Sequence, residues 1–138
     1  MLSDTFWLKK YVASLLTVLL MAGTASAQPI MIELPSPVSD GVREPNLSSL
    51  PDGRILMSWI EPAGAEFAVK MAILDGTVWS EPRTVVQADD LFVNWADFPS
   101  AVAFADGTLA AHWLQKNGTS SYQYDVKVAL SPDEGKTW

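Results

Sequence analysis

Short apolar stretches separated by turn residues make up most of the chain after its first thirty positions. Twice, in residues 44–61 and 98–115, an apolar stretch is followed by Asp-Gly and then by a second apolar stretch with Trp near its end. Because Asp-Gly accepts positive φ in a tight turn, each segment is predicted to form a β-hairpin. In the second strand of each hairpin, most positions on both sides of the alternation are apolar. We therefore expect these strands to be covered on both faces.

The two segments are copies of one unit, related by a constant offset of 54 residues. The matching positions pair Pro45 with Pro99, Leu50 with Phe104, Asp52-Gly53 with Asp106-Gly107, Ile55 with Leu109, and Trp59 with Trp113. A third strand is predicted at residues 67–73 and again at 124–130, and a fourth at about 83–87. After residue 27, no stretch of the sequence keeps a helical period, because Pro and Gly residues interrupt it. The unit is therefore predicted to be a four-stranded antiparallel meander.

Repeated four-stranded sheets of this length are the units of β-propellers, so we expect an all-β fold built from propeller blades. Residues 28–42 are predicted to be a linker, 43–90 the first blade, and 91–138 an incomplete second blade of three strands. The alternative is an ordinary β-sandwich made of two hairpin pairs. A sandwich does not require its halves to share residues at one period, so the repeat favours the propeller. On this interpretation we expect the 138 residues to be a piece of a longer protein.

The first 27 residues have the layout of a cleavable secretory signal peptide. Lys9 and Lys10 precede an apolar run at about residues 11–22, and the small residues Ala25-Ser26-Ala27 follow. The run holds about a dozen residues, whereas a membrane-spanning helix needs about 20. We therefore expect a secreted or periplasmic protein that has no membrane association once residues 1–27 are removed.

Composition excludes several classes of protein. The hydrophobic fraction of 49% and the six Trp argue against a disordered chain. The absence of Cys excludes a disulfide-stapled miniprotein and a Cys-ligated zinc module. The formal net charge of −7 argues against a nucleic-acid partner, which would require a basic surface. With one His and no cluster of ligands, the sequence indicates no metal site, and we expect no cofactor.

The final eight residues, Ser131-Pro-Asp-Glu-Gly-Lys-Thr-Trp138, match the pattern Ser-x-Asp-x-Gly-x-Thr-Trp. This segment resembles the Asp-box, or BNR repeat, of sialidases and related β-propellers. The residue types suit a turn: Ser131 and Asp133 are expected to bind backbone N–H groups, Gly135 to take positive φ, and Trp138 to pack under the loop. In that superfamily the box is structural, so these four residues are expected to stabilise the fold and not to catalyse. Residues 75–79 look like a shortened copy.

The same resemblance implies a substrate site at the propeller axis, near the starts of the innermost strands. Arg43-Glu44-Pro45 is similar to the Arg-Ile-Pro motif of sialidases. This implies that Arg43 is a substrate-binding residue, whose planar guanidinium binds a carboxylate of the substrate. The alternative is a solvated Arg in a loop before a strand.

Asp97 lies 54 residues after that Arg, so both are expected at the same face, one blade apart. It resembles the pocket-lining Asp of sialidases and is our candidate catalytic residue; the alternative is an Asp that caps a turn. Asn94 and Trp95 beside it are candidate substrate-binding residues, because sugar sites combine planar apolar surface with polar groups. His112, at the position of Ser58, is a further candidate for substrate binding, although a single His in a strand is more often a hydrogen-bonded packing residue.

Part of the sialidase pattern is missing from the chain. In that family an Arg and then the acid/base Asp follow the second strand of the first blade, but residues 60–66 contain neither. Glu61 and Glu66 are the candidates to replace them. The Tyr nucleophile and its Glu partner come from later blades of the family, and Tyr122 and Tyr124 are expected to be strand residues.

The resemblance therefore implies the N-terminal part of a secreted sialidase-like glycoside hydrolase, which hydrolyses a terminal glycosidic bond of a glycan. The alternative is a non-catalytic Asp-box propeller that binds carbohydrate or protein, and the missing charged groups after residue 60 favour it. The 138-residue chain alone is expected to have no glycosidase activity.

Overall fold

The computed structural model describes residues 28–138. The chain divides into two units, Met1–Glu33 and Leu34–Trp138, and the fold described below is that of the second unit. The predicted signal peptide, residues 1–27, lies outside the described residues. Between residues 28 and 138 there is no helix and all strand pairs are antiparallel, which confirms the all-β class. No described residue belongs to a helix long and apolar enough to cross a membrane.

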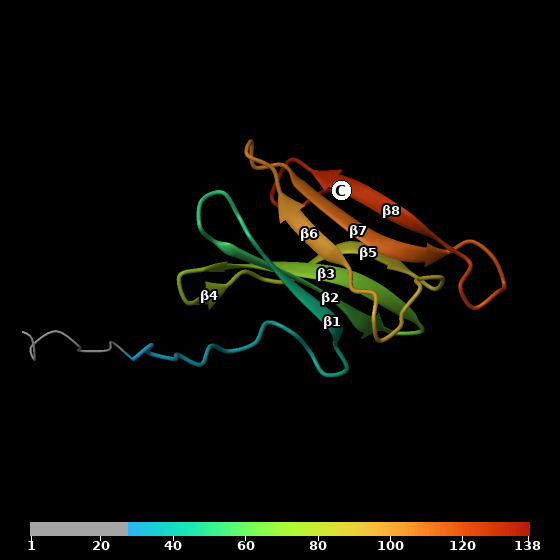
Figure 1. The fold of residues 1–138 in the computed structure, drawn as a ribbon, viewed down its shortest axis with the longest axis horizontal. Helices are drawn as coiled ribbons and strands as arrows, with labels where there is room; N and C mark the ends of the chain where they lie inside the picture. Colours follow the sequence, from blue (N-terminus) through green and yellow to red (C-terminus); the bar gives the residue numbers. More distant parts are fainter. Residues whose placement is uncertain (1–27) are drawn as a thin grey trace, which may run out of the picture. The chain divides into compact units, whose positions relative to one another are not determined.

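The first sheet is a meander in which the third strand pairs with three neighbours (Figure 1). Its strands are β1 (Arg43–Ser49), β2 (Ile55–Ala63), β3 (Glu66–Asp75), β4 (Val78–Trp79) and β5 (Arg83–Ala88). β5 pairs with β3 and confirms the fourth strand predicted at about 83–87. β4 is not among the predicted strands. Asp75 pairs with Val78, so residues 75–79 form a hairpin with a two-residue turn, and the side-chain hydrogen bonds of the 131–138 turn have no equivalent within residues 75–79.

The second sheet has three strands, β6 (Ser100–Ala103), β7 (Leu109–Lys116) and β8 (Tyr124–Ser131), in the order β6-β7-β8. The three strands predicted for the second copy are thereby confirmed. Tyr124 begins β8 as expected, but the predicted strand position of Tyr122 is wrong. The reason is a closed loop: the N–H of Asn117 donates to Gln123 O (3.1 Å), and the N–H of Gln123 donates to Ser120 O (3.2 Å).

The two Asp-Gly turns have the same hydrogen bonds, as the repeat predicts. In the first turn the N–H of Leu50 donates to Arg54 O (2.8 Å) and that of Gly53 donates to Leu50 O (3.0 Å). In the second turn Phe104 and Gly107 make the equivalent bonds at 2.8 and 3.0 Å. Gly53 and Gly107 have φ angles of 88° and 86°, a region that favours glycine because it has no Cβ.

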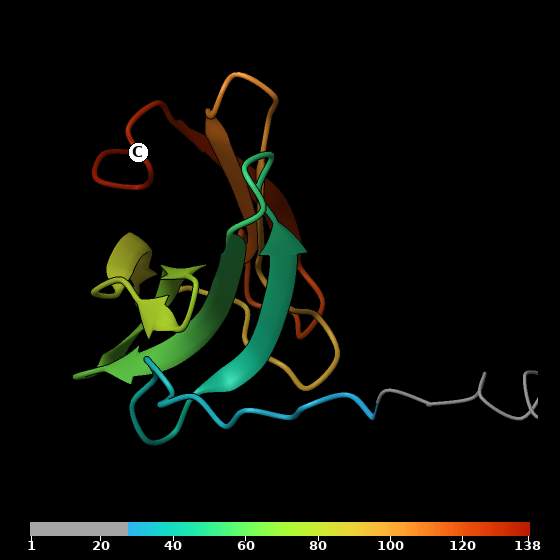
Figure 2. The ribbon, with the colours of Figure 1, turned by 90° about the vertical axis from the view of Figure 1, so that its left-hand side faces the viewer.

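The two sheets pack face to face, with β1 and β6 side by side (Figures 1 and 2). Burial of apolar side chains drives this contact; the shared cluster includes Leu56, Ile60, Val69, Met71, Ile73, Ala101, Leu109 and Ala111. Three side-chain hydrogen bonds fix its alignment: Ser58 Oγ donates to Pro99 O (3.0 Å), Ser48 Oγ to Ala101 O (2.6 Å), and Ser100 Oγ to Asn46 Oδ1 (3.1 Å).

Part of the predicted linker, residues 34–42, lies against the outer face of the first sheet. Ser39 Oγ donates to Glu61 Oε2 (3.2 Å), and residues 35–37 share a cavity lining with residues 77–82. Trp59 points to this outer face, because it alternates with the inward-facing Ser58, and it is fully buried. Residues 34–42 are therefore part of the packed structure.

The predicted covering of both faces is correct for β2 and wrong for β7. β2 lies between the second sheet and the layer formed by residues 34–42. β7 buries Leu109 and Ala111 against the first sheet, whereas the alternate residues Ala110, His112 and Leu114 stay half-exposed. Nothing among residues 28–138 packs over this second face, on which the neighbouring residues of β8 are exposed.

Candidate functional site

The starts of β1 and β6 lie at the same end of the two sheets. We call this the loop end, and we call the opposite end, where the Asp-Gly turns lie, the turn end (Figure 1). The hydrogen bond between Ser100 and Asn46 sets the alignment, and Asp97 and Arg43 each lie three residues before one of these partners. The repeat therefore brings Arg43 and Asp97 to one end, as the offset predicts. Within the described part of the chain, no hydrogen bond or ion pair joins them directly.

Asn94 organises the turn that carries Asp97. Its Oδ1 accepts hydrogen bonds from the backbone N–H groups of Ala96 (2.6 Å) and Asp97 (2.9 Å). Its Nδ2 donates to Asp97 Oδ2 (2.5 Å). An Asn side chain that binds the backbone two and three residues on makes a tight local turn. Asn94 thus holds the Asp97 carboxylate in place, while that carboxylate itself remains exposed to solvent.

Trp95 is 93% exposed at the tip of this turn. The segment on either side of the turn is anchored. Phe92 N–H donates to Leu114 O (2.9 Å), and the Phe92 ring stacks on Tyr124 at 4.4 Å between centroids. On the other side, the carbonyl of Pro99 accepts the bond from Ser58. An exposed indole on a fixed turn provides a flat apolar surface for a ligand.

Arg43 sits in an irregular start of β1. The pairing register of β1 with β2 shifts between Arg43 and Asn46, and Glu44 has a φ of 47°. A left-handed conformation costs a non-glycine residue roughly 1–2 kcal/mol, so the surrounding structure must hold it. The Arg43 guanidinium lies 5.9 Å from the centre of the Phe67 ring, a cation–π contact that leaves its N–H donors open to solvent. Burial raises the pKa of Glu44, against the smaller opposing effect of Arg43.

His112 lies on β7, opposite the first residue of β6. It pairs with Ser100 and Val128 in the middle of the second sheet, on the face turned away from the first sheet. Ser100 begins β6 three residues after Asp97, and among residues 28–138 no hydrogen bond joins His112 to the Asn94–Asp97 turn.

Glu61 lies in a closed polar cluster on the outer face of the first sheet. Its carboxylate pairs with Lys70 Nζ (2.6 Å), accepts from Trp59 Nε1 (2.8 Å) and accepts from Ser39. Burial raises the pKa of Glu61, but the hydrogen bonds from Lys70 and Trp59 outweigh it and hold the pKa below its ordinary value. Glu61 is therefore ionised at neutral pH and fully engaged, so it is unsuited to act as a general acid.

Glu66, the other candidate to replace the missing acid, begins β3 on the surface. Its carboxylate accepts a hydrogen bond from Gln87 Nε2 (2.7 Å) on the neighbouring strand β5. This contact ties two strands together and does not direct the carboxylate toward Asp97.

The Trp59–Glu61 hydrogen bond has a counterpart that sequence reasoning missed. In the second sheet Trp113 Nε1 donates to Gln115 Oε1 at 3.3 Å. The signal was present in the repeat, because Trp59-Ile-Glu61 matches Trp113-Leu-Gln115. Residues i and i+2 lie on the same face of a strand, so each indole N–H meets the oxygen two residues on. The pattern is a structural device of the repeat.

Residues 131–138 form a turn with the predicted contacts. Gly135 N–H donates to Ser131 Oγ (2.7 Å), and Thr137 N–H donates to Asp133 Oδ1 (2.8 Å). Gly135 has a φ of 85°, and the Trp138 ring lies beneath it, packed against the core. A Cβ at position 135 would lie 2.7 Å from Met71 Sδ of the first sheet. The structural role expected for Ser131, Asp133, Gly135 and Trp138 fits these contacts.

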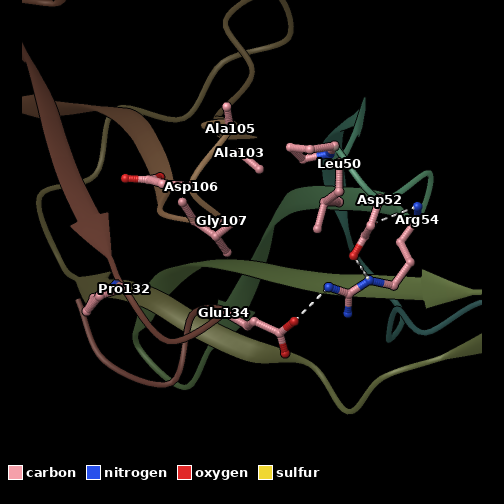
Figure 3. A pocket seen from close by; sticks show the side chains of 11 residues that line it. Leu50, Asp52, Arg54, Ala103, Ala105, Asp106, Gly107, Pro132 and Glu134 are labelled. Carbon is pink, nitrogen blue, oxygen red and sulfur yellow. Dashed lines mark hydrogen bonds and ion pairs between the residues drawn. The ribbon is translucent and has the colours of Figure 1, made fainter.

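A cavity of about 400 Å³ opens between the two sheets at the turn end (Figure 3). Three of its four charged side chains are already paired with one another: Arg54 Nε contacts Asp52 at 2.7 Å, and Arg54 Nη2 contacts Glu134 at 2.7 Å. The fourth, Asp106, accepts a hydrogen bond from the N–H of Thr108 (2.9 Å). Arg83 also donates to the Glu134 carbonyl. These bonds attach the 131–138 turn to the first sheet, so the charged residues that line the cavity have a structural role. The loop end therefore remains the candidate functional site.

Among residues 28–138, no three His, Asp or Glu side chains are grouped closely enough to hold a metal ion. Comparison with protein-family models gives no match to the chain, and comparison with curated proteins gives none either. A functional assignment therefore depends on the chemistry and geometry of the chain's own residues.

Proposed function

We propose that residues 43–138 are the first blade and three strands of the second blade of a secreted sialidase-like β-propeller. In this proposal the whole protein hydrolyses a terminal glycosidic bond of a glycan bound at the loop end. The hydrogen bonds of the 131–138 turn, which suit an Asp-box, support the family.

The way in which the sheets stack also supports a propeller. The first sheet makes contact through the face that carries Ser58, and the second through the face that carries Ala111. The position equivalent to Ser58 in the second sheet is His112, which lies on the opposite face from Ala111. Equivalent faces of the two sheets therefore point the same way. Equivalent faces of successive blades point the same way in a propeller, whereas a sandwich of two hairpin pairs does not require this arrangement.

The exposed Trp95, next to Asp97 and at the same end as Arg43, carries the functional proposal. Trp95 stacks on the face of a sugar ring, and Arg43 binds a carboxylate of the substrate. Asp97 donates a proton to the oxygen of the leaving group, as the acid of a glycosidase does. Asn94 is a positioning residue, because its amide binds one oxygen of Asp97 and orients the carboxyl group.

A second candidate function is a non-catalytic propeller that binds carbohydrate or protein. The engaged carboxylate of Glu61 favours it, because this residue of the first sheet is charged, buried and bound to three partners. The loop end would then keep its role in recognition and lose its role in catalysis.

Glycan binding by the 138-residue chain tests the recognition step. Sialosides and neutral glycosides would be titrated by calorimetry against the chain and against Trp95→Ala and Arg43→Ala. We expect each substitution to weaken binding about tenfold, or ~1.4 kcal/mol. Phe104→Ala is the matched control, because Phe104 is an exposed aromatic residue at the turn end. Unchanged binding in both loop-end variants, with weaker binding in Phe104→Ala, would show that the glycan binds at the turn end and would contradict the proposed site.

Hydrolysis separates the two candidate functions. The 138-residue chain should not turn over a fluorogenic sialoside. In the full-length protein that the proposal requires, Asp97→Asn should lower kcat with little change in KM, since it removes a proton donor and keeps the shape of the side chain. If the full-length protein binds sialosides without hydrolysing them, the binding function is correct and the enzymatic one is wrong.

A further inference from the structure

The loop between β7 and β8, residues 117–123, contains the chain's only Asn-Gly pair, Asn117-Gly118 (Figure 1). Every residue of this loop is exposed. In an Asn-Gly pair the backbone nitrogen of the glycine can attack the side-chain amide carbon of the asparagine, because glycine has no Cβ to block the approach and rotates freely about its backbone. The loop is therefore a candidate site of covalent self-modification.

The backbone nitrogen of Gly118 has no hydrogen-bond acceptor within residues 28–138. The glycines of the two Asp-Gly turns differ, because the N–H groups of Gly53 and Gly107 each donate to a carbonyl three residues back at 3.0 Å. A nitrogen that is bound inside a closed turn can attack only after the turn opens. The structure therefore leaves the Gly118 nitrogen free to react and holds those of Gly53 and Gly107.

The loop itself requires the glycine of this pair. The N–H of Asn117 donates to Gln123 O (3.1 Å), and the N–H of Gln123 donates to Ser120 O (3.2 Å), which closes the loop. The side-chain amide of Gln123 lies where a Cβ of residue 118 would be. Any other residue at position 118 would displace Gln123, so the closed loop and the reactive pair depend on the same glycine.

The Asn117 amide is held by a hydrogen bond to β8. Its Nδ2 donates to Asp125 Oδ1 (2.6 Å), and the other oxygen of Asp125 pairs with Lys127 Nζ (3.1 Å). Because the bond to Asp125 is exposed, water competes for it and it restrains the amide only weakly. The hydrogen bond from Lys127, and after it the one from Asn117, lowers the pKa of Asp125 below its ordinary value, so this carboxylate is ionised at neutral pH. A carboxylate at position 117 would remove the donor and place a second negative charge beside Asp125.

We propose that Asn117 converts itself to Asp and isoaspartate and thereby opens the loop 117–123. The Gly118 nitrogen bonds to Asn117 Cγ, the Cγ–Nδ2 bond breaks, and ammonia leaves with the proton of the Gly118 N–H. One water molecule then opens the succinimide ring, at Cγ to give Asp or at the backbone carbonyl to give isoaspartate. Both products lose the donor to Asp125, and isoaspartate adds a methylene to the main chain, so the loop opens. No step depends on the glycan chemistry of the proposed function.

Asp106→Asn provides the matched control, because it creates a second Asn-Gly pair inside a closed turn. The asparagine oxygen can keep the bond that Asp106 Oδ1 accepts from Thr108 N–H (2.9 Å). The 138-residue chain with this substitution would be made in a host that does not glycosylate the Asn117-Gly-Thr119 sequon. It would then be kept in mildly alkaline buffer and digested, and mass spectrometry with isoaspartate methylation would measure the conversion at both positions.

We expect position 117 to convert at least about tenfold faster than position 106, and faster in more alkaline buffer, because the deprotonated Gly118 nitrogen is the attacking group. Asn46 and Asn94, which are not followed by glycine, should stay unconverted over the same time. Gln123→Ala with Gly118→Ala should convert about tenfold more slowly than Gln123→Ala alone, since Gln123→Ala makes room for the added Cβ. No conversion at position 117, or equal rates at positions 106 and 117, overturns the proposal.

Hydrogen exchange tests the opening of the loop. In Asn117→Asp, which matches one of the two products, the N–H groups at positions 117 and 123 should exchange about two- to fivefold faster relative to their unprotected rates. Adding Asp125→Asn should reverse this effect, because the donor and the acceptor of the side-chain hydrogen bond then swap places. Unchanged exchange in Asn117→Asp would show that the modification leaves the loop closed and would overturn this part of the proposal.

Discussion

At the scale of single residues, Asp133 shows how one carboxylate organises a turn. It accepts hydrogen bonds from Thr137 Oγ1 (2.7 Å), Thr137 N–H (2.8 Å) and Ser131 Oγ (2.8 Å). The two bonds from Thr137 are the main reason that the pKa of Asp133 is lowered to about 2. A carboxylate with three donors closes the loop between β8 and the Trp138 ring, which packs against the core.

This lowered pKa predicts a dependence of stability on pH. The folded protein keeps Asp133 ionised at acidities where the unfolded chain binds a proton at its ordinary pKa of 3.8. The stabilisation from Asp133 is therefore complete above about pH 5 and is lost as the pH falls toward 2. Asp133→Asn should lower the midpoint of urea unfolding at pH 7, and the difference from wild type should shrink below pH 4.

Asp75→Asn is the control for this prediction, because Asp75 is an exposed Asp in a turn of the first sheet, and no side-chain hydrogen bond to it is found within residues 28–138. It should leave the midpoint at pH 7 unchanged. A difference in unfolding midpoint between Asp133→Asn and wild type that stays constant from pH 7 to pH 2.5 would contradict the stabilising role of the Asp133 charge.

At the scale of elements, the same hairpin is built twice from different apolar residues. Leu50 and Phe104 occupy equivalent positions, yet both turns keep the Asp-Gly pair and the same backbone bonds. The Asp52 and Asp106 carboxylates each accept from the N–H two residues on, at 3.1 and 2.9 Å. The turn therefore depends on the Asp oxygen and on the positive φ of the glycine, and it tolerates variation around them.

Gly53→Ala and Gly107→Ala should each lower the free energy of unfolding by about 1 kcal/mol, because a Cβ is strained at positive φ. No atom lies within 4 Å of an added Cβ at either position, so the cost comes from the backbone conformation and should be similar in the two turns. Urea unfolding measures it. Gly53→Asn is the matched variant and should cost less, since Asn tolerates this region. Equal losses for Ala and Asn would point to a cause other than φ.

At the scale of the whole molecule, the two sheets depend on one another for stability, because each sheet has few buried residues. Ser58 and Ser48 of the first sheet donate to carbonyls of Pro99 and Ala101, and Arg54 reaches Glu134 in the turn after β8. Met71 lies under Gly135 of that same turn. These contacts are spread from the loop end to the turn end, so we expect the sheets to unfold in a single transition.

Ser58→Ala tests this dependence. It leaves the Pro99 carbonyl without its partner in a buried interface, and should lower the free energy of unfolding by about 1–3 kcal/mol. Hydrogen exchange should then accelerate in β6 as well as in β2. Ser49→Ala is the control, because Ser49 is exposed at the end of β1, and it should change neither quantity. Faster exchange confined to β2 would show that the sheets are independent.

Much of the fold could be predicted because its determinants are local. Alternation and the Asp-Gly turns specify the long strands, and the Ser-x-Asp-x-Gly-x-Thr-Trp spacing specifies a self-contained turn. The hairpin at Asp75 and Val78 was missed because two residues are too short for a periodic signal. At the loop end, the offset brought Arg43 and Asp97 together correctly. It did not show on which face of the second sheet His112 lies, because that depends on which face of β7 the first sheet covers.

The sequence by itself determined the strands, the turns and the 54-residue repeat, because these depend on residues close together along the chain. Only the tertiary structure decided whether an individual side chain is buried, paired or exposed. It placed Glu61 in a closed cluster with Lys70 and left Trp95 exposed. It also buried Met71 while leaving its equivalent, Val128, open. Equivalent residues differ in this way because burial and pairing are set by the layer packed against a face, and the neighbours in that layer are distant in sequence.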